Sequence, residues 1–70
     1  MKFQENNVYF NYYVKGTLIE RAGRFGYFGI VDQATGEYFD NVFRIFEDED
    51  GEYIDLPYSP NRLTNRLFSN

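Results

Sequence analysis

The sequence predicts a mainly β domain of the α+β type, a small antiparallel meander or barrel of five or six strands with a short C-terminal helix. Three observations predict this fold class. Runs rich in Val, Ile, Tyr and Phe recur between short segments that contain Gly, Asn or Asp. The stretch Val42 to Tyr58 places an Asp-Gly pair between two apolar runs. After it, apolar residues recur at helical spacing behind a Ser-Pro pair.

The chain length fits a single domain, residues 1–70. A chain of this size buries only about 60% of the surface that its unfolded form exposes, so its core is marginal. It has no cysteine, and therefore no disulfide can staple the fold. Association with a partner or with a second copy is one way in which such a chain gains stability.

The N-terminal half begins with a polar lead-in. Val8 to Val14 then predicts a strand, because it is rich in β-branched and aromatic residues, and it carries rings on both faces. Lys15-Gly16 predicts a tight turn into a second strand, Thr17 to Arg21. The segment RAGRFG that follows contains two glycines and two arginines, which predicts a cationic loop.

Tyr27 to Val31 predicts the next strand. Asp32 to Gly36 is typical of a type I turn closed by a glycine at positive φ. The chain returns through Glu37 to Phe39. Asp40-Asn41 then either bulges a continuous strand or turns between two short ones.

Val42 to Tyr58 predicts the hairpin around which the domain is organised. A type I′ turn at Asp50-Gly51 suits the tip, because such turns need positive φ at both central positions. A two-residue turn at this pair would place Ile45 opposite Leu56. A slip by one residue would mix apolar and charged positions, so burial favours this pairing. One face then carries Phe43, Ile45, Ile54 and Leu56, and the other carries Val42, Arg44, Phe46, Tyr53 and Asp55.

Residues 59–68 predict the C-terminal helix. Ser59 is a suitable N-cap, and Pro60 suits the first helical position. Leu63, Leu67 and Phe68 follow at helical spacing, so one apolar stripe would lie on the sheet.

An enzyme is not expected. The chain has no histidine and no cysteine, which excludes His-based triads and tetrahedral zinc sites. The seryl hydroxyls of Ser59 and Ser69 therefore have no histidine base. No cofactor and no metal site are predicted either. If Gly51 were the sixth residue of an EF-hand loop, Phe46 and Pro57 would stand at its first and last positions, where neither side chain supplies oxygen.

The N-terminus lacks the apolar region of a signal peptide, and no apolar run approaches the roughly 18 residues of a membrane span. The sequence therefore predicts a soluble, cytoplasmic protein without membrane contact.

Charge is distributed unevenly. The net charge is −4, and six of the eleven carboxylates lie between residues 47 and 55. Outside that stretch, seven basic residues face five acidic ones, so the rest of the chain is mildly basic. The acidic total argues against nucleic acid and anionic membranes as partners, and the basic remainder weakens that argument for nucleic acid.

Aromatic residues are the other peculiarity of the composition. Eight Phe and seven Tyr are more rings than one face of a small sheet can hide. Either the rings fill the core while tyrosine hydroxyls reach solvent, or some of them form a contact surface.

Together these features favour a small non-catalytic binding protein, a regulator or inhibitor that acts through protein–protein contact. The acidic hairpin tip would steer it to a basic surface, such as that of a nucleic-acid-binding protein, by partial mimicry of nucleic acid. Small phage inhibitors offer a class-level analogy of size and charge, and a homodimer is a further alternative. The predicted partner-binding residues are Phe46, Glu47, Asp48, Glu49, Asp50, Glu52 and Tyr53.

Residues 16–46 resemble part of the cold-shock family. Gly16-Thr17-Leu18 is similar to that family's Gly-Thr-Val opening, and Gly26 to Ile30 to its first ribonucleoprotein motif. Asn41 to Phe46 is similar to its second motif. The resemblance implies an oligonucleotide-binding barrel and hence the alternative function, a single-stranded nucleic-acid-binding module. Its predicted platform is Arg24, Tyr27, Phe28, Phe43 and Arg44.

Residues 42–58 resemble stage V sporulation protein G. VFRIFEDEDGEYIDLP is similar to that family's apolar–basic–apolar strand, glycine turn and strand ending in proline. The resemblance implies a β-meander followed by a helix. The family's link to nucleic acid would rest here on Arg62 and Arg66.

Overall fold

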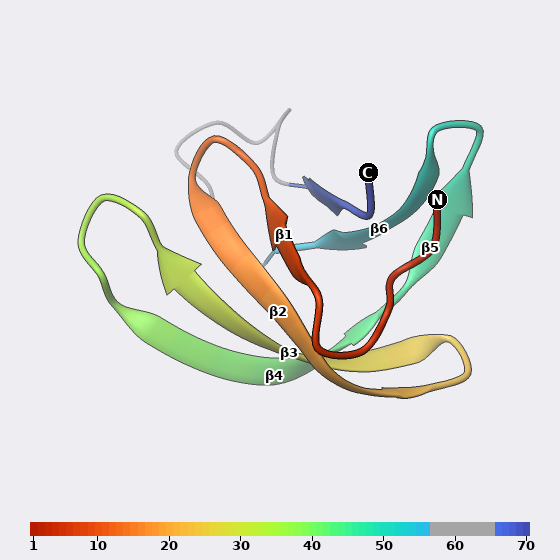
Figure 1. Cartoon of the computed structure of the whole chain (residues 1–70), viewed down its shortest axis with the longest axis horizontal. Helices are drawn as coiled ribbons and strands as arrows, with labels where there is room; N and C mark the ends of the chain where they lie inside the picture. Colours follow the sequence, from red (N-terminus) through yellow and green to blue (C-terminus); the bar gives the residue numbers. More distant parts are fainter. Residues whose placement is uncertain (57–65) are drawn as a thin grey trace.

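The computed structural model describes residues 1–56 and 66–70, and these form seven β-strands in two antiparallel sheets (Figure 1). One sheet has four strands in the order β1-β2-β3-β4, and the other has three in the order β5-β6-β7. The strands are β1 (Val8–Phe10), β2 (Val14–Ala22), β3 (Phe25–Asp32), β4 (Tyr38–Arg44), β5 (Phe46–Asp48), β6 (Gly51–Asp55) and β7 (Arg66–Phe68). Within each sheet, every strand pairs with its neighbour in the sequence, which confirms the predicted antiparallel meander, but the described residues form seven strands where five or six were predicted.

The first predicted turn is misplaced. Lys15-Gly16 lies inside β2, where Gly16 pairs with Tyr9 of β1 and Ile30 of β3. The chain turns earlier, and the Asn11 Oδ1 atom accepts hydrogen bonds from the N–H groups of Tyr13 (2.7 Å) and Val14 (2.8 Å). An asparagine that caps the following backbone in this way is a common turn device.

The β3–β4 turn is where the sequence places it. The Asp32 Oδ1 atom accepts from the N–H of Ala34 (2.8 Å) and of Thr35 (3.1 Å), and Gly36 has a φ of 79°. Asp40-Asn41 is neither a bulge nor a turn, because both residues lie in the regular register of β4. The irregularity of this sheet lies in β2 instead, between residues 18 and 20.

The chain passes from one sheet to the other at Ile45, between β4 and β5. The Ile45 N–H donates to the Arg24 carbonyl at 2.7 Å, and its side chain is buried. β5 and β6 then form a hairpin in which Phe46 pairs with Tyr53 and Asp48 with Gly51.

The predicted hairpin register is wrong by two residues. The turn is Glu49-Asp50, and positive φ occurs at Gly51 (115°), which opens β6. Because side chains in a strand alternate with a period of two, a shift by two keeps every side chain on its predicted face. The predicted dry face is therefore confirmed: Phe43, Ile45, Ile54 and Leu56 are buried.

The described part of the C-terminal stretch contains no helix. Residues 66–68, the end of the predicted helix 59–68, form β7, which pairs with β6 through Tyr53–Phe68 and Ile54–Leu67. The predicted start of that helix, Ser59-Pro60, and Leu63 lie outside the described residues. Successive side chains of a strand point to opposite faces, so Leu67 points to the core while its neighbours point away. The helical prediction assumed a different spacing of the apolar residues.

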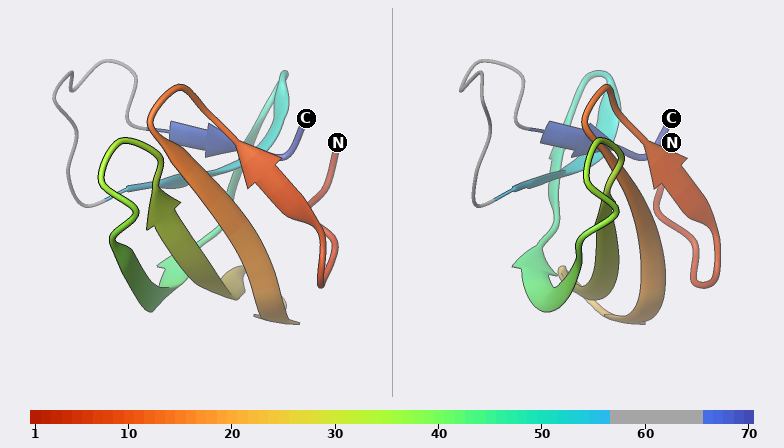
Figure 2. Two further views of the ribbon diagram at one scale, coloured as in Figure 1. Left: turned by 60° about the vertical axis from the view of Figure 1, so that its left-hand side comes forward. Right: turned by 90° about the vertical axis from the view of Figure 1, so that its left-hand side faces the viewer.

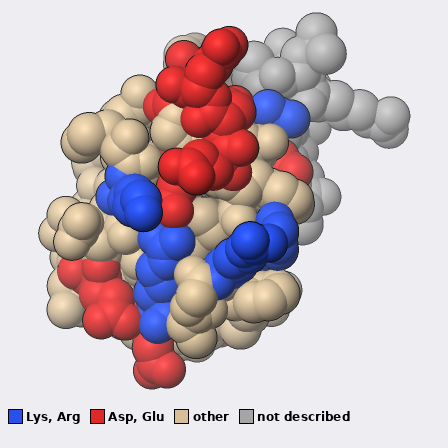
Figure 3. All heavy atoms as spheres, turned by 90° about the vertical axis from the view of Figure 1, so that its right-hand side faces the viewer, with Lys and Arg blue, Asp and Glu red and all other residues tan. Residues whose placement is uncertain are grey.

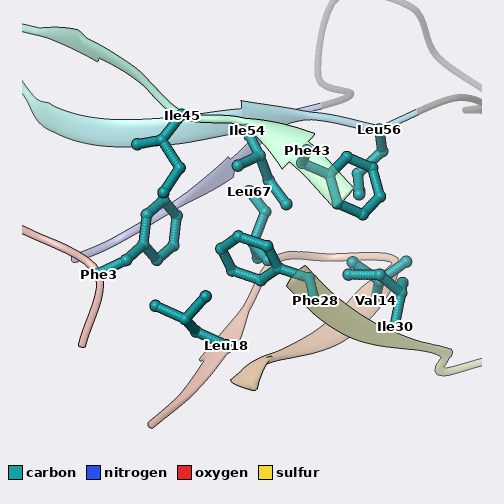
Figure 4. Packing of buried hydrophobic residues seen from close by; sticks show 10 residues of the cluster. All are labelled: Phe3, Val14, Leu18, Phe28, Ile30, Phe43, Ile45, Ile54, Leu56 and Leu67. Carbon is teal, nitrogen blue, oxygen red and sulfur yellow. The ribbon is translucent and has the colours of Figure 1, made fainter. Parts of the chain in front are cut away.

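The two sheets enclose one apolar core (Figure 4). Side chains from both sheets point toward one another, with Phe28 and Leu18 facing Ile54 and Leu67. The buried apolar residues are Phe3, Val14, Leu18, Phe28, Ile30, Phe43, Ile45, Ile54, Leu56 and Leu67. Strand pairing does not run from one sheet into the other, so the described strands do not close into the predicted alternative of a barrel.

Both ends of the chain lie beside the start of β6, and the further views bring the termini close together (Figure 2). The Met1 carbonyl accepts hydrogen bonds from the Glu52 N–H (3.0 Å) and the Ser69 hydroxyl (2.8 Å). The Ser69 N–H donates to the Glu52 carbonyl at 2.8 Å. The start of β6, directly after the hairpin turn, is thus held by both the N-terminal and the C-terminal segment.

Candidate functional site

The acidic tip consists of Glu47, Asp48, Glu49 and Asp50. All four side chains are exposed, and on the face shown in Figure 3 they lie beside a group of Lys and Arg side chains. The Asp48 Oδ1 atom accepts a hydrogen bond from the Asp50 N–H at 2.8 Å, which orders the turn. The tip therefore presents negative charge on a defined backbone.

Glu52 was predicted to belong to the same contact surface, but it is only 5% exposed. Its two carboxylate oxygens accept hydrogen bonds from both terminal nitrogens of Arg21, at 2.7 and 2.8 Å. The Phe3 N–H also donates to Oε1, at 2.9 Å. The hydrogen bonds from Arg21 lower the pKa of the Glu52 carboxyl, and the same pair raises the pKa of Arg21. Glu52 thus anchors the hairpin internally.

A groove of about 360 Å³ lies below the acidic tip. It runs between the loop after β2, the end of β4 and the outer side of the β5–β6 hairpin. The residues that line it are Arg21, Arg24, Arg44, Ile45, Phe46, Glu47, Glu52 and Tyr53. Three arginines therefore line one groove next to the tip carboxylates.

A row of rings crosses the outer face of the second sheet. Phe46, Tyr53 and Phe68 are cross-strand partners on β5, β6 and β7. The Phe46 and Tyr53 rings stack with centroids 5.6 Å apart, and the Tyr53 and Phe68 rings are 5.3 Å apart. The Arg44 guanidinium lies 4.7 Å from the Phe46 centroid, and that of Arg66 lies 4.3 Å from the Tyr53 centroid. Such stacked guanidinium groups keep their N–H edges available.

The alternative nucleic-acid platform does not form one surface. Phe28 is fully buried and Phe43 is 8% exposed, so neither ring can stack on a base. Tyr27 neighbours Phe28 on β3 and therefore points to the opposite face of the sheet. Arg24 and Arg44 do come together, but at the groove below the acidic tip.

Most of the described rings reach the surface. Among the described residues, only Phe3, Phe28 and Phe43 are buried rings. Phe10, Tyr12, Phe25 and Tyr38 are more than half exposed. Tyr9, Tyr13 and Phe39 are partly buried and pack against the core, so the described rings divide between core packing and the surface.

The Ser69 hydroxyl is buried and donates to the Met1 carbonyl, which is a structural role. On the first sheet, a hydrogen bond to Asp40 raises the pKa of Tyr27, and partial desolvation raises that of Tyr38, so both phenols are protonated at neutral pH. No group of acidic side chains in residues 1–56 and 66–70 is arranged to hold a metal ion.

The described residues include no helix long and apolar enough to cross a membrane.

Comparisons with family models, with curated proteins and with solved structures return no match. The resemblances to the cold-shock family and to stage V sporulation protein G therefore stay predictions.

Three residues of this surface, Arg21, Arg66 and Phe68, were not predicted to belong to it. Phe68 was assigned to a helix, although the polar–apolar–aromatic alternation of residues 66–68 also fits a strand. The pairing of Arg21 with Glu52 joins residues 31 positions apart, and no local pattern indicates it.

Proposed function

We propose that the chain is a small non-catalytic protein-binding module, a regulator or inhibitor that docks on a basic surface of its partner. The tip carboxylates of Glu47, Asp48, Glu49 and Asp50 make the charged contact, and Phe46 with Tyr53 supplies the adjoining apolar contact. A surface that otherwise binds phosphates has the complementary charge, so the tip acts as a partial mimic of nucleic acid.

The observation that carries this proposal is the rigid support of the tip. The charged turn begins directly beside a partly buried ion pair, Arg21–Glu52, in which the Glu52 carboxylate also accepts a hydrogen bond from the backbone N–H of Phe3. A charged element that is already ordered loses less conformational entropy on binding than a flexible one. The exposed rings around it supply the kind of side chains that are enriched at protein interfaces.

Charge reversal at the tip tests the proposal. In the variant Glu49→Lys/Asp50→Lys, no side chain that orders the turn or anchors the hairpin is changed. We expect the partner's association rate to fall at least about tenfold at low salt, because opposite charges steer encounter. The bait is attached through Ala34→Cys, since the chain has no other cysteine and Ala34 lies in the exposed β3–β4 turn. The protein captured from the cells of origin is purified and its binding rates are measured.

The matched control is Glu20→Lys/Glu37→Lys. It changes the net charge by the same amount at exposed positions away from the tip. Equal association rates for the tip variant and the control would remove the tip from the proposal, whereas a loss confined to the tip variant supports it.

A further inference from the structure

Arg24 and Arg44 are the basis of a further inference about the groove below the acidic tip. Arg21 is paired with Glu52, and Arg66 is paired with Asp55 at 3.4 Å. In the part of the chain that the structure describes, no carboxylate forms an ion pair with Arg24 or Arg44. Both nevertheless line the same groove. The groove therefore contains two guanidinium groups that form no ion pair with any described carboxylate.

Arg44 is also held in place. Its guanidinium lies on the Phe46 ring, and one terminal nitrogen donates to the Ile45 carbonyl at 3.2 Å. A guanidinium whose face is covered by a ring still offers N–H groups along its edge, and it is well suited to a planar, bidentate acceptor. The Arg66 guanidinium lies on the Tyr53 ring in the same way, 4.3 Å from its centroid.

The charge balance of the groove selects among anions. Its lining carries three arginines against Glu47 and Glu52, a formal charge of +1. One carboxylate would neutralise this charge, whereas a dianionic phosphate would leave the groove with a net negative charge beside the three other tip carboxylates.

We propose that this groove binds a carboxylate side chain, an Asp or Glu of the protein partner, between Arg24 and Arg44. The inference rests on the proposed function and makes it more specific. The partner surface has a basic patch for the tip and, next to it, an acidic residue for the groove. Such paired charges of opposite sign fix one orientation of docking and reject the reverse one.

The test needs no partner. The isolated protein is titrated with sodium acetate, and separately with inorganic phosphate, at constant ionic strength. The backbone amide and arginine Nε–H signals are followed by NMR. We expect saturable shifts at Arg24 and Arg44. In Arg24→Gln the acetate affinity falls about fivefold, the amount that one exposed ion pair contributes.

Lys15→Gln is the matched control, because it removes the same charge from an exposed position of β2 outside the groove, and we expect no change in acetate affinity. Shifts that do not saturate, or an equal effect of both variants, would overturn the inference. Phosphate binding tighter than acetate binding would overturn the carboxylate assignment. If acetate fails to bind but tip reversal still slows partner association, the proposed function stands without this groove.

Discussion

At the scale of single residues, the feature that matters most is the ion pair of Arg21 and Glu52. A buried carboxylate is costly unless it is paired and hydrogen-bonded, and this one accepts bonds from the guanidinium and from the Phe3 N–H. The pair lies where the acidic tip, the groove and the core meet. It therefore supports both proposed contacts, and it lies in the lining of the groove itself.

This pair predicts a dependence of stability on pH. The pKa of Glu52 is lowered from its ordinary value of 4.5 in the folded state. The unfolded chain therefore binds the proton first as the pH falls, and the stabilisation that is present at neutral pH is lost through and below pH 4.5. We expect the free energy of unfolding of Glu52→Gln to change less between pH 6 and pH 3 than that of the wild type. Urea unfolding across this range measures it.

Exposed Glu20 supplies the control for this experiment. Glu20→Gln removes an exposed carboxylate that lies outside the Arg21–Glu52 pair, so its pH profile should follow that of the wild type. If the Glu52→Gln profile also followed the wild type, the ion pair would not contribute to the pH dependence.

At the same scale, the sequence predicts burial better than it predicts partners. The alternation of residues 43, 45, 54 and 56 correctly indicates which side chains enter the core, because the period of a strand is local. The alternation of Tyr27 and Phe28 also shows that both cannot lie on one platform. The burial of Glu52 was not predictable, because its partner Arg21 is on another sheet.

At the scale of elements, the β5–β6 hairpin shows how a distant contact places a turn. Asp50-Gly51 is a good local signal for a type I′ turn, yet Gly51 opens β6 instead. An added Cβ at Gly51 would lie 2.9 Å from the Met1 nitrogen and 3.0 Å from its carbonyl oxygen. The glycine is thus required both by its positive φ and by the N-terminal segment packed against it, and only the first requirement is local.

Substitution of Gly51 separates these two requirements. We expect Gly51→Ala to lower the free energy of unfolding by about 3 kcal/mol, from backbone strain plus the contact with Met1. Gly23→Ala also places alanine at positive φ (58°), but into open space, and should cost only about 1 kcal/mol. Chemical denaturation of both variants measures the difference. Equal losses would mean that the N-terminal segment does not constrain the turn.

At the scale of the whole molecule, β7 joins the two sheets. Leu67 is fully buried in the shared core, and its side chain packs against Gly16 of β2, where an added Cβ would collide with it. The sequence indicates an apolar C-terminal stretch correctly. It does not indicate a strand, because the hydrogen-bonding partner of that stretch is β6 and the surface it covers is β2.

Truncation of Leu67 tests this role. We expect Leu67→Ala to lower the free energy of unfolding by about 3 kcal/mol, because it leaves a cavity between the sheets. The exposed neighbour Arg66 offers a comparison, and Arg66→Ala should cost no more than about 1 kcal/mol. Thermal or urea unfolding measures both. A small loss for Leu67→Ala would show that β7 is not docked as described.

Both chain ends meet at the start of β6, and this has a practical consequence. A short linker between Asn70 and Met1 would turn the polypeptide into a ring, and new ends could be opened between Ala34 and Thr35, in an exposed turn. Such a circular permutant should keep both sheets. A fusion placed directly on Met1, by contrast, would crowd the same corner that orients the acidic tip.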